Sequence, residues 1–183
     1  NQTPNFRSIM SCERFCMLPS FFHFVNNDEI IPNGEEGYDA LFKIRPLLEL
    51  VDDRLLSSHA PGKNLSFDES MLKFKGHWIL KQYCPQKPTK WGIKEYDLAE
   101  GKTGYILKHL PYHGKNTTIA EGNRLVTEQL VVDMVKGFEN KGHVVYLDRF
   151  FTSPRLAKEL YSKGIGMCGT IKKNRVGMPE DLK

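Results

Sequence analysis

Two aspartates in this chain lie at positions where a carboxylate could take part in catalysis. Asp148 ends the apolar run HVVYL, and Asp68 lies in the alternating stretch LSFDES. A carboxylate at the end of a buried run is costly unless something compensates its charge. Two carboxylates brought together in a partly buried site would bind a divalent cation, and oxygen ligands suit Mg²⁺ or Mn²⁺. Paired ions of this kind would activate a water or a 3′-hydroxyl and stabilise the leaving oxygen at phosphorus.

Each aspartate also has a structural explanation. Aspartate favours the cap of a helix, but Ser153 followed by Pro154 suits the cap after Asp148 better. Asp68 could lie in a surface turn, and its spacing alone does not decide between a turn and a strand. Glu69 and Asp97 are rival acids, and alternation along their strands predicts that both are solvated.

A cluster of lysines between residues 71 and 94 is the second chemical feature. This segment holds six lysines and no acid, so it carries +6, whereas the whole chain has a formal net charge of +4. Lysines interleaved with Trp78 and Trp91 could neutralise phosphates while the aromatic rings stack or pack. The pattern predicts contacts with a polyanion such as a nucleic-acid backbone from Lys73, Lys75, Lys81, Lys87, Lys90 and Lys94. The alternative is a solvated charged face over core tryptophans, and it stays open.

Composition limits the class of protein. A chain of 183 residues, 40% of them hydrophobic, fits one globular domain with a sizeable core. The four cysteines form no CxxC pair, so neither a disulfide framework nor a zinc site is favoured. No apolar run approaches the ~18 residues of a membrane span and none has the layout of a signal peptide, so we expect a soluble protein that is not associated with a membrane.

The elements that must position the aspartates follow from periodicity. Residues 1–58 predict a helical lead-in, with Ser11 suited to a first turn, Pro19 as a kink and Pro46 as an interruption. Strands are expected in LSFDESMLKF, with a break at Glu-Ser, and in WGIKEYDLAE and KTGYILKHLPY. The GKTG sequence between the last two lacks the spacing of a phosphate loop and predicts a hairpin turn.

The second half of the chain alternates helices and strands. EGNRLVTEQLVVDMVKGF predicts a helix capped by Asn123, with Leu125 and Val126 on its apolar face. HVVYLD predicts a strand covered on both faces, SPRLAKELYSKG a helix, and IGMCGTI a last strand.

This order predicts an α/β fold of ribonuclease-H-like type. Its mixed sheet is a three-stranded antiparallel meander followed by α/β crossovers, with the first and fourth strands side by side. That arrangement would make Asp68 and Asp148 neighbours. The predicted core spans residues 59–183, and we expect it to be incomplete at the C-terminus, because both ends of the sequence look cut.

Several separated blocks resemble one known family. LSFDESMLKFKG, KQYCPQKPTKWGIK, KTGYIL, VVYLDRFFTSPRLAKEL and GTIKKNRVGMPEDL have the order and spacing of blocks in piggyBac transposases, and the helical opening MSCERFCMLPSFFHFVNN is similar as well. The resemblance implies a DDE transposase core with two divalent metals that moves DNA by cut and paste. It maps the first two catalytic, metal-binding aspartates onto Asp68 and Asp148, and it places the third beyond Lys183.

The resemblance carries further expectations about the intact parent. These are DNA as partner, the nucleus as location, and a homodimer. Arg149 stands where the family commonly has asparagine, and His77 where it commonly has arginine. These departures leave a second function open, a domesticated and catalytically inactive module that binds DNA or protein.

Overall fold

A computed structural model describes residues 5–114, 117–122 and 124–182. The chain forms two compact units, Asn1–Glu49 and Leu50–Lys183. The predicted division after residue 58 stays a prediction. Asn123, predicted to cap a helix, lies outside the described residues.

The first unit is built from short helices joined by turns. They are α1 (Phe6–Ile9), α2 (Cys12–Phe21), η1 (Asn27–Glu29) and η2 (Phe42–Ile44). The hydroxyl of Ser11 accepts a hydrogen bond from the Arg14 amide at 3.2 Å, so the expected cap of α2 is confirmed. Pro19 lies in the last turn of α2, which ends two residues later.

Helix α3 (Arg45–Ser58) follows, and Pro46 is its second residue. The predicted interruption at Pro46 is wrong, because proline is tolerated in the first turn, where backbone amides have no partner within the helix.

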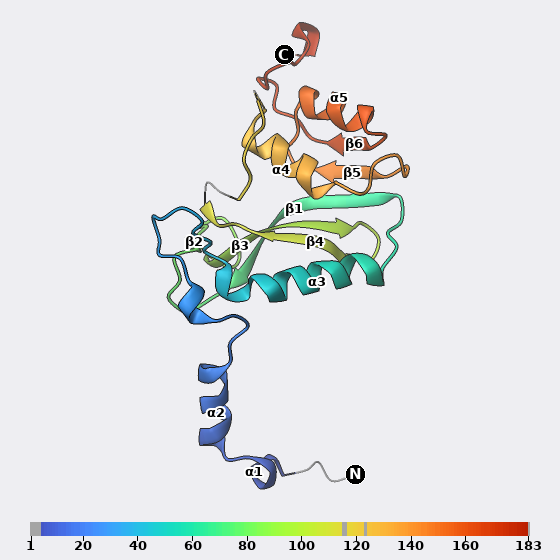
Figure 1. Cartoon of the computed structure of the whole chain (residues 1–183). Helices are drawn as coiled ribbons and strands as arrows, with labels where there is room; N and C mark the ends of the chain where they lie inside the picture. Colours follow the sequence, from blue (N-terminus) through green and yellow to red (C-terminus); the bar gives the residue numbers. More distant parts are fainter. Residues whose placement is uncertain (1–4, 115–116, 123, 183) are drawn as a thin grey trace. The chain divides into compact units, whose positions relative to one another are not determined.

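A six-stranded sheet forms the centre of the second unit (Figure 1). Its strands are β1 (Asn64–Lys73), β2 (Lys81–Tyr83), β3 (Trp91–Glu100), β4 (Ile106–Pro111), β5 (Val144–Leu147) and β6 (Gly166–Gly169). The order is β2-β3-β1-β5-β6, and β4 also pairs with β3. The predicted antiparallel meander is confirmed in β1, β3 and β4, and the GKTG turn joins β3 to β4.

Strand β1 has no break at Glu69-Ser70, which corrects the sequence expectation. Antiparallel pairing with β3 continues without interruption from Leu65 to Lys73, so the strand's partner overrides the local turn signal. The three-residue strand β2 was not predicted. It pairs with the start of β3 over Trp91–Ile93.

Two helices complete the second unit before the short final turn η4 (Glu180–Leu182). They are α4 (Val126–Met134) and α5 (Pro154–Ser162). The Ser153 hydroxyl caps α5 by accepting from the Leu156 amide at 3.1 Å, and Gly164 follows the helix with a φ of 69°. Both features confirm the predicted helix ends. Leu125 and Val126 are exposed, not buried as expected, because Leu125 is the residue that caps α4 and Val126 only starts it.

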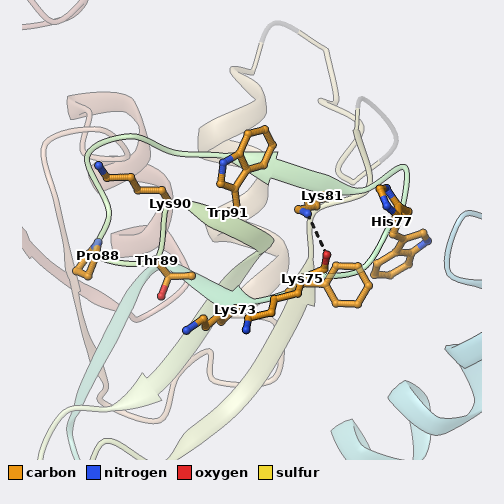
Figure 2. A pocket seen from close by; sticks show the side chains of 10 residues that line it. Lys73, Lys75, His77, Lys81, Pro88, Thr89, Lys90 and Trp91 are labelled. Atoms are coloured by element: carbon orange, nitrogen blue, oxygen red, sulfur yellow. Dashed lines mark hydrogen bonds between the residues drawn. The ribbon is translucent and has the colours of Figure 1, made fainter. Parts of the chain in front are cut away.

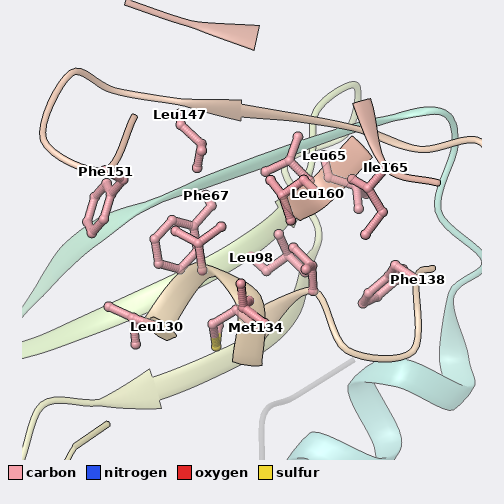
Figure 3. Close-up of a cluster of buried hydrophobic side chains, with 14 of the residues drawn as sticks. Leu65, Phe67, Leu98, Leu130, Met134, Phe138, Leu147, Phe151, Leu160 and Ile165 are labelled. Atoms are coloured by element: carbon pink, nitrogen blue, oxygen red, sulfur yellow. The ribbon is translucent and has the colours of Figure 1, made fainter. Parts of the chain in front are cut away.

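One face of the sheet carries the hydrophobic core (Figure 3). Phe67, Leu98 and Leu147 point from three strands toward side chains of α4 and α5, among them Leu130, Met134 and Leu160. On the opposite face Tyr146 is 43% exposed. The prediction that β5 is covered on both faces is therefore wrong for the described part of the chain.

Candidate functional site

Asp68 lies in strand β1, and Asp148 directly follows strand β5, which pairs with β1 in parallel. In the pairing of β1 with β5, Phe67 lies opposite Leu147, and each aspartate is the next residue along. Because side chains alternate and both preceding residues are buried in the core, both aspartates leave the sheet on the other face. Adjacent strands are about 4.8 Å apart, so a continuation of this register by one residue would bring the two carboxylates close together.

Local hydrogen bonds hold one oxygen of each carboxylate. Asp68 Oδ1 accepts from the Glu69 amide at 2.8 Å, and Asp148 Oδ1 accepts from the amides of Phe150 at 2.8 Å and Phe151 at 3.3 Å. Among the described residues no hydrogen bond reaches Oδ2 of either aspartate. Both side chains are exposed, which corrects the expectation of a partly buried site. Asp148 thus orients the turn after β5 and keeps one oxygen for a ligand.

Asp68 and Asp148 match only part of the ligand set of a divalent cation. Two carboxylates are enough protein ligands for Mg²⁺, which keeps several waters and takes phosphate oxygens. Within residues 5–114, 117–122 and 124–182, no three His, Cys, Asp or Glu side chains are arranged to hold a metal ion. A Mg²⁺ or Mn²⁺ site at Asp68 and Asp148 therefore stays a prediction.

The rival acids are not solvated as expected. Glu69 is half-buried, and one of its carboxylate oxygens lies 3.3 Å from Lys87 Nζ. Asp97 pairs with Asp68 across β1 and β3, and with His109 across β3 and β4, so it faces the same side of the sheet as Asp68. It is half-buried there.

Helix α3 accounts for part of that burial. Asp52 Oδ1 lies 3.3 Å from His109 Nε2, and the Tyr105 hydroxyl donates to the Leu55 carbonyl at 3.2 Å. The helix therefore contacts the β3–β4 hairpin on the face away from the main core.

Glu95 lies in β3 on the same face as Asp97, and its pKa predicts how the stability of the fold depends on pH. Burial raises its pKa, the charge of Asp97 raises it further, and His109 opposes the shift. The folded protein thus retains this proton to a higher pH than the unfolded chain, so the contribution to stability is fully present near pH 4 and is lost as pH rises through the folded pKa.

We expect Glu95→Gln to be more stable than the parent chain at pH 7, by about 1 kcal/mol or less, with the difference vanishing near pH 4. Urea unfolding at both values measures it. Glu36→Gln, at an exposed position, serves as the control and should show no such pH-dependent difference. A gain for Glu95→Gln that is equal at both pH values would contradict the assignment.

The lysine-rich segment lines a cavity of about 800 Å³ (Figure 2). No acid lines it, and its wall includes Lys73, Lys75, Lys81 and Lys90 together with Phe74, His77, Trp78 and Trp91. Four of the six predicted DNA-binding lysines thus come together. The other two lie elsewhere: Lys87 is bound to Glu69, and Lys94 Nζ lies 5.0 Å from the centre of the Tyr96 ring. We name this cavity the basic aromatic pocket.

Sequence reasoning missed a second group of cations near Asp148. Arg175 Nη2 donates to the carbonyl oxygens of Arg149 at 2.6 Å and Phe150 at 2.8 Å, so it holds the turn that follows the aspartate. Arg175 also lines a cavity of about 460 Å³ with Arg155, Lys172 and the buried Glu128. The charge of residues 172–175 was the available signal, but only the fold brings them to this turn.

Comparison with known proteins identifies the family. A family model described as Transposase IS4 matches residues 1–183. The chain belongs to this transposase family. It is 28% identical to human PiggyBac transposable element-derived protein 2 over 93% of its length, and 30% identical to human PiggyBac transposable element-derived protein 3 over 91%. The resemblance to piggyBac proteins is confirmed.

A solved structure agrees with the fold of this transposase-family chain. The match is a cryo-EM structure of the piggyBac transposase synaptic complex with hairpin DNA, with a TM-score of 0.83, 28% identity and coverage of 98% of the present chain. The predicted ribonuclease-H-like fold is thereby confirmed. The chain spans 37% of that protein and 29% and 28% of the two human relatives. No helix in the described part of the chain is long and apolar enough to cross a membrane.

Proposed function

We propose that this chain is the DNA-handling core of a piggyBac-type transposase, in which Asp68 and Asp148 bind Mg²⁺ or Mn²⁺. The observation that carries the proposal is the parallel register of β1 and β5, whose last pair, Phe67 and Leu147, directly precedes the two aspartates. When bound, the ions would activate the attacking oxygen and stabilise the leaving oxygen during cleavage and transfer of DNA strands.

The chain's own residues prepare the site for this role. The amides of Phe150 and Phe151 fix one oxygen of Asp148, so its carboxylate is oriented before a ligand arrives. Both carboxylates are exposed, and a DNA phosphate can therefore approach them. The basic aromatic pocket supplies cations for the DNA backbone. By family resemblance the intact parent would act in the nucleus as a homodimer.

A second function is a domesticated module that binds DNA or protein without cleaving it. It is favoured by the charge of the residue that directly follows Asp148. Arg149 adds an exposed residue of positive charge directly after Asp148, and a guanidinium there would compete with a cation for the carboxylate.

Manganese binding separates the two functions. The 183-residue chain is titrated with Mn²⁺ and free Mn²⁺ is followed by electron paramagnetic resonance. We expect Asp68→Asn and Asp148→Asn each to weaken binding about tenfold or more, because each removes a charged ligand. Asp133→Asn, which removes an acid on α4 that is paired with Lys136, is the matched control and should bind as the parent does.

Equal Mn²⁺ binding by the parent chain and the Asp68→Asn, Asp148→Asn double variant would overturn the metal site. The affinity for duplex DNA, measured as a function of salt concentration, then tests whether the chain is an inactive DNA-binding module. A salt-dependent affinity that survives in the double variant would support the inactive DNA-binding module.

A further inference from the structure

We propose that the basic aromatic pocket binds one unpaired nucleotide of DNA, with its base stacked on Trp91 and its phosphates held by Lys73, Lys75 and Lys90. The inference deepens the proposed function, because it names the form of DNA that this part of the chain takes. It would place a strand end or an extrahelical base beside the sheet that carries Asp68.

The first observation is the exposure of Trp91. This residue is 54% exposed, although tryptophan is among the residues that bury most surface on average. Two residues of β2 contact its ring: Tyr83 lies with its ring centre 4.7 Å away, and Lys81 Nζ lies 5.4 Å from the indole centre. Strand β2 therefore supports the indole, and more than half of the residue's surface stays open to a ligand.

The second observation is the arrangement of charge. Figure 2 shows Lys73 and Lys75 across the pocket from Lys90 and Trp91. Lys73, Lys75 and Lys90 are exposed, and no acid lines the pocket. Lys81 has a different task, since its ammonium donates to the carbonyl oxygens of Gly76 at 3.1 Å and Lys75 at 3.4 Å. It fixes the wall of the pocket while the three exposed lysines remain available to a polyanion.

The third observation is concavity. The volume of about 800 Å³ is within the range of roughly 300–1,000 Å³ in which proteins enclose small ligands. A duplex presents its phosphates on a convex backbone and keeps its bases stacked, so it can use the lysines but offers no free base to the exposed indole. An unpaired nucleotide offers both a phosphate and a free aromatic face. An acidic protein segment would use the lysines and leave Trp91 without a stacking partner.

The test compares two DNA probes of the same sequence. One is a fully paired duplex and the other carries a single extrahelical thymine, and binding of each to the whole chain is measured by fluorescence anisotropy. We expect the parent chain to prefer the extrahelical probe. Trp91→Leu keeps apolar bulk but removes the aromatic face. It should weaken binding of the extrahelical probe about tenfold and leave binding of the paired duplex unchanged.

Four further variants keep the result interpretable. Trp91→Phe restores an aromatic face and should recover most of the preference, which a merely structural role for Trp91 would not require. Tyr161→Leu removes an aromatic residue that is 83% exposed on α5 and should not change the binding of either probe. Lys73→Gln and Lys90→Gln should lower the salt dependence of binding for the extrahelical probe.

The inference fails if Trp91→Leu keeps the preference of the parent chain, or if an acidic peptide competes equally well with both probes. These outcomes are independent of the manganese titration. Loss of the metal site with a preserved extrahelical preference would overturn only the proposed catalysis, and the reverse would overturn only the nucleotide site.

Discussion

Phe151→Ala is expected to lower the free energy of unfolding by about 3–5 kcal/mol, the usual cost of removing a large buried aromatic side chain. Phe151 is 1% exposed, and its ring centre lies 4.9 Å from that of Phe67 and 6.3 Å from that of Tyr96. The ring therefore joins the turn after β5 to strands β1 and β3. Urea unfolding followed by circular dichroism measures the loss.

The neighbouring residue provides a matched control. Phe150 lies in the same turn but is 48% exposed, so Phe150→Ala should cost less than about 1 kcal/mol. Similar losses for the two variants would show that the turn is not anchored through Phe151.

Phe151→Ala should also disturb the orientation of the Asp148 carboxylate. The Phe151 amide donates to Asp148 Oδ1 at 3.3 Å, and the ring fixes the position of that amide. Under conditions where the variant is still folded, we expect weaker Mn²⁺ binding for Phe151→Ala than for Phe150→Ala. Phe151→Leu keeps more of the buried volume and should fall between them in both measurements.

The topology around the two aspartates could be predicted because local signals agree with it. Ser153 and Gly164 mark the ends of α5 by cap chemistry that needs no tertiary information. Apolar alternation marks β1 and β3, and the order of strands and helices leaves few arrangements of the sheet. The adjacency of Asp68 and Asp148 then follows from the parallel pairing of β1 with β5.

What could not be predicted depends on partners far away in the sequence. Glu-Ser in β1 has the composition of a turn, and only the pairing with β3 keeps the strand continuous. Strand β2 is three residues long and has no periodic signal of its own. The ion pair of Lys87 with Glu69 joins residues 18 positions apart, so charge counting treated Lys87 as available to DNA.

The exposure of Asp68 and Asp148 could not be predicted either, because it depends on which elements cover each face of the sheet. The run HVVYL indicates a buried strand, yet only alternate residues of β5 face the core. Tyr146 and Asp148 leave on the other face, where the described elements do not cover them. A short apolar run cannot show how many faces of the strand are covered.

The second large effect is expected at Gly92 of β3, which pairs with Lys73 of β1. A Cβ at this position would overlap the carbonyl oxygen of Leu72, and the Leu72 carbonyl carbon would lie only 2.9 Å from it. Backbone atoms cannot yield as a flexible side chain does, so the strands must separate. We expect Gly92→Ala to cost about 3 kcal/mol, at the upper end for overpacking.

Gly101→Ala is the graded control for Gly92→Ala, because its Cβ would approach the Asn64 carbonyl oxygen only to 3.2 Å. We expect a much smaller loss there. Gly92 lies opposite Lys73 of β1 and Gln82 of β2, so separation at this point also moves the two walls of the basic aromatic pocket apart. Faster hydrogen exchange at the amides of β2 and the start of β3 should accompany the loss of stability, together with a reduced preference for the extrahelical DNA probe. Equal unfolding midpoints for the two alanine variants would show that β1 and β3 tolerate a side chain at Gly92, and the close strand contact would then have no part in shaping the pocket.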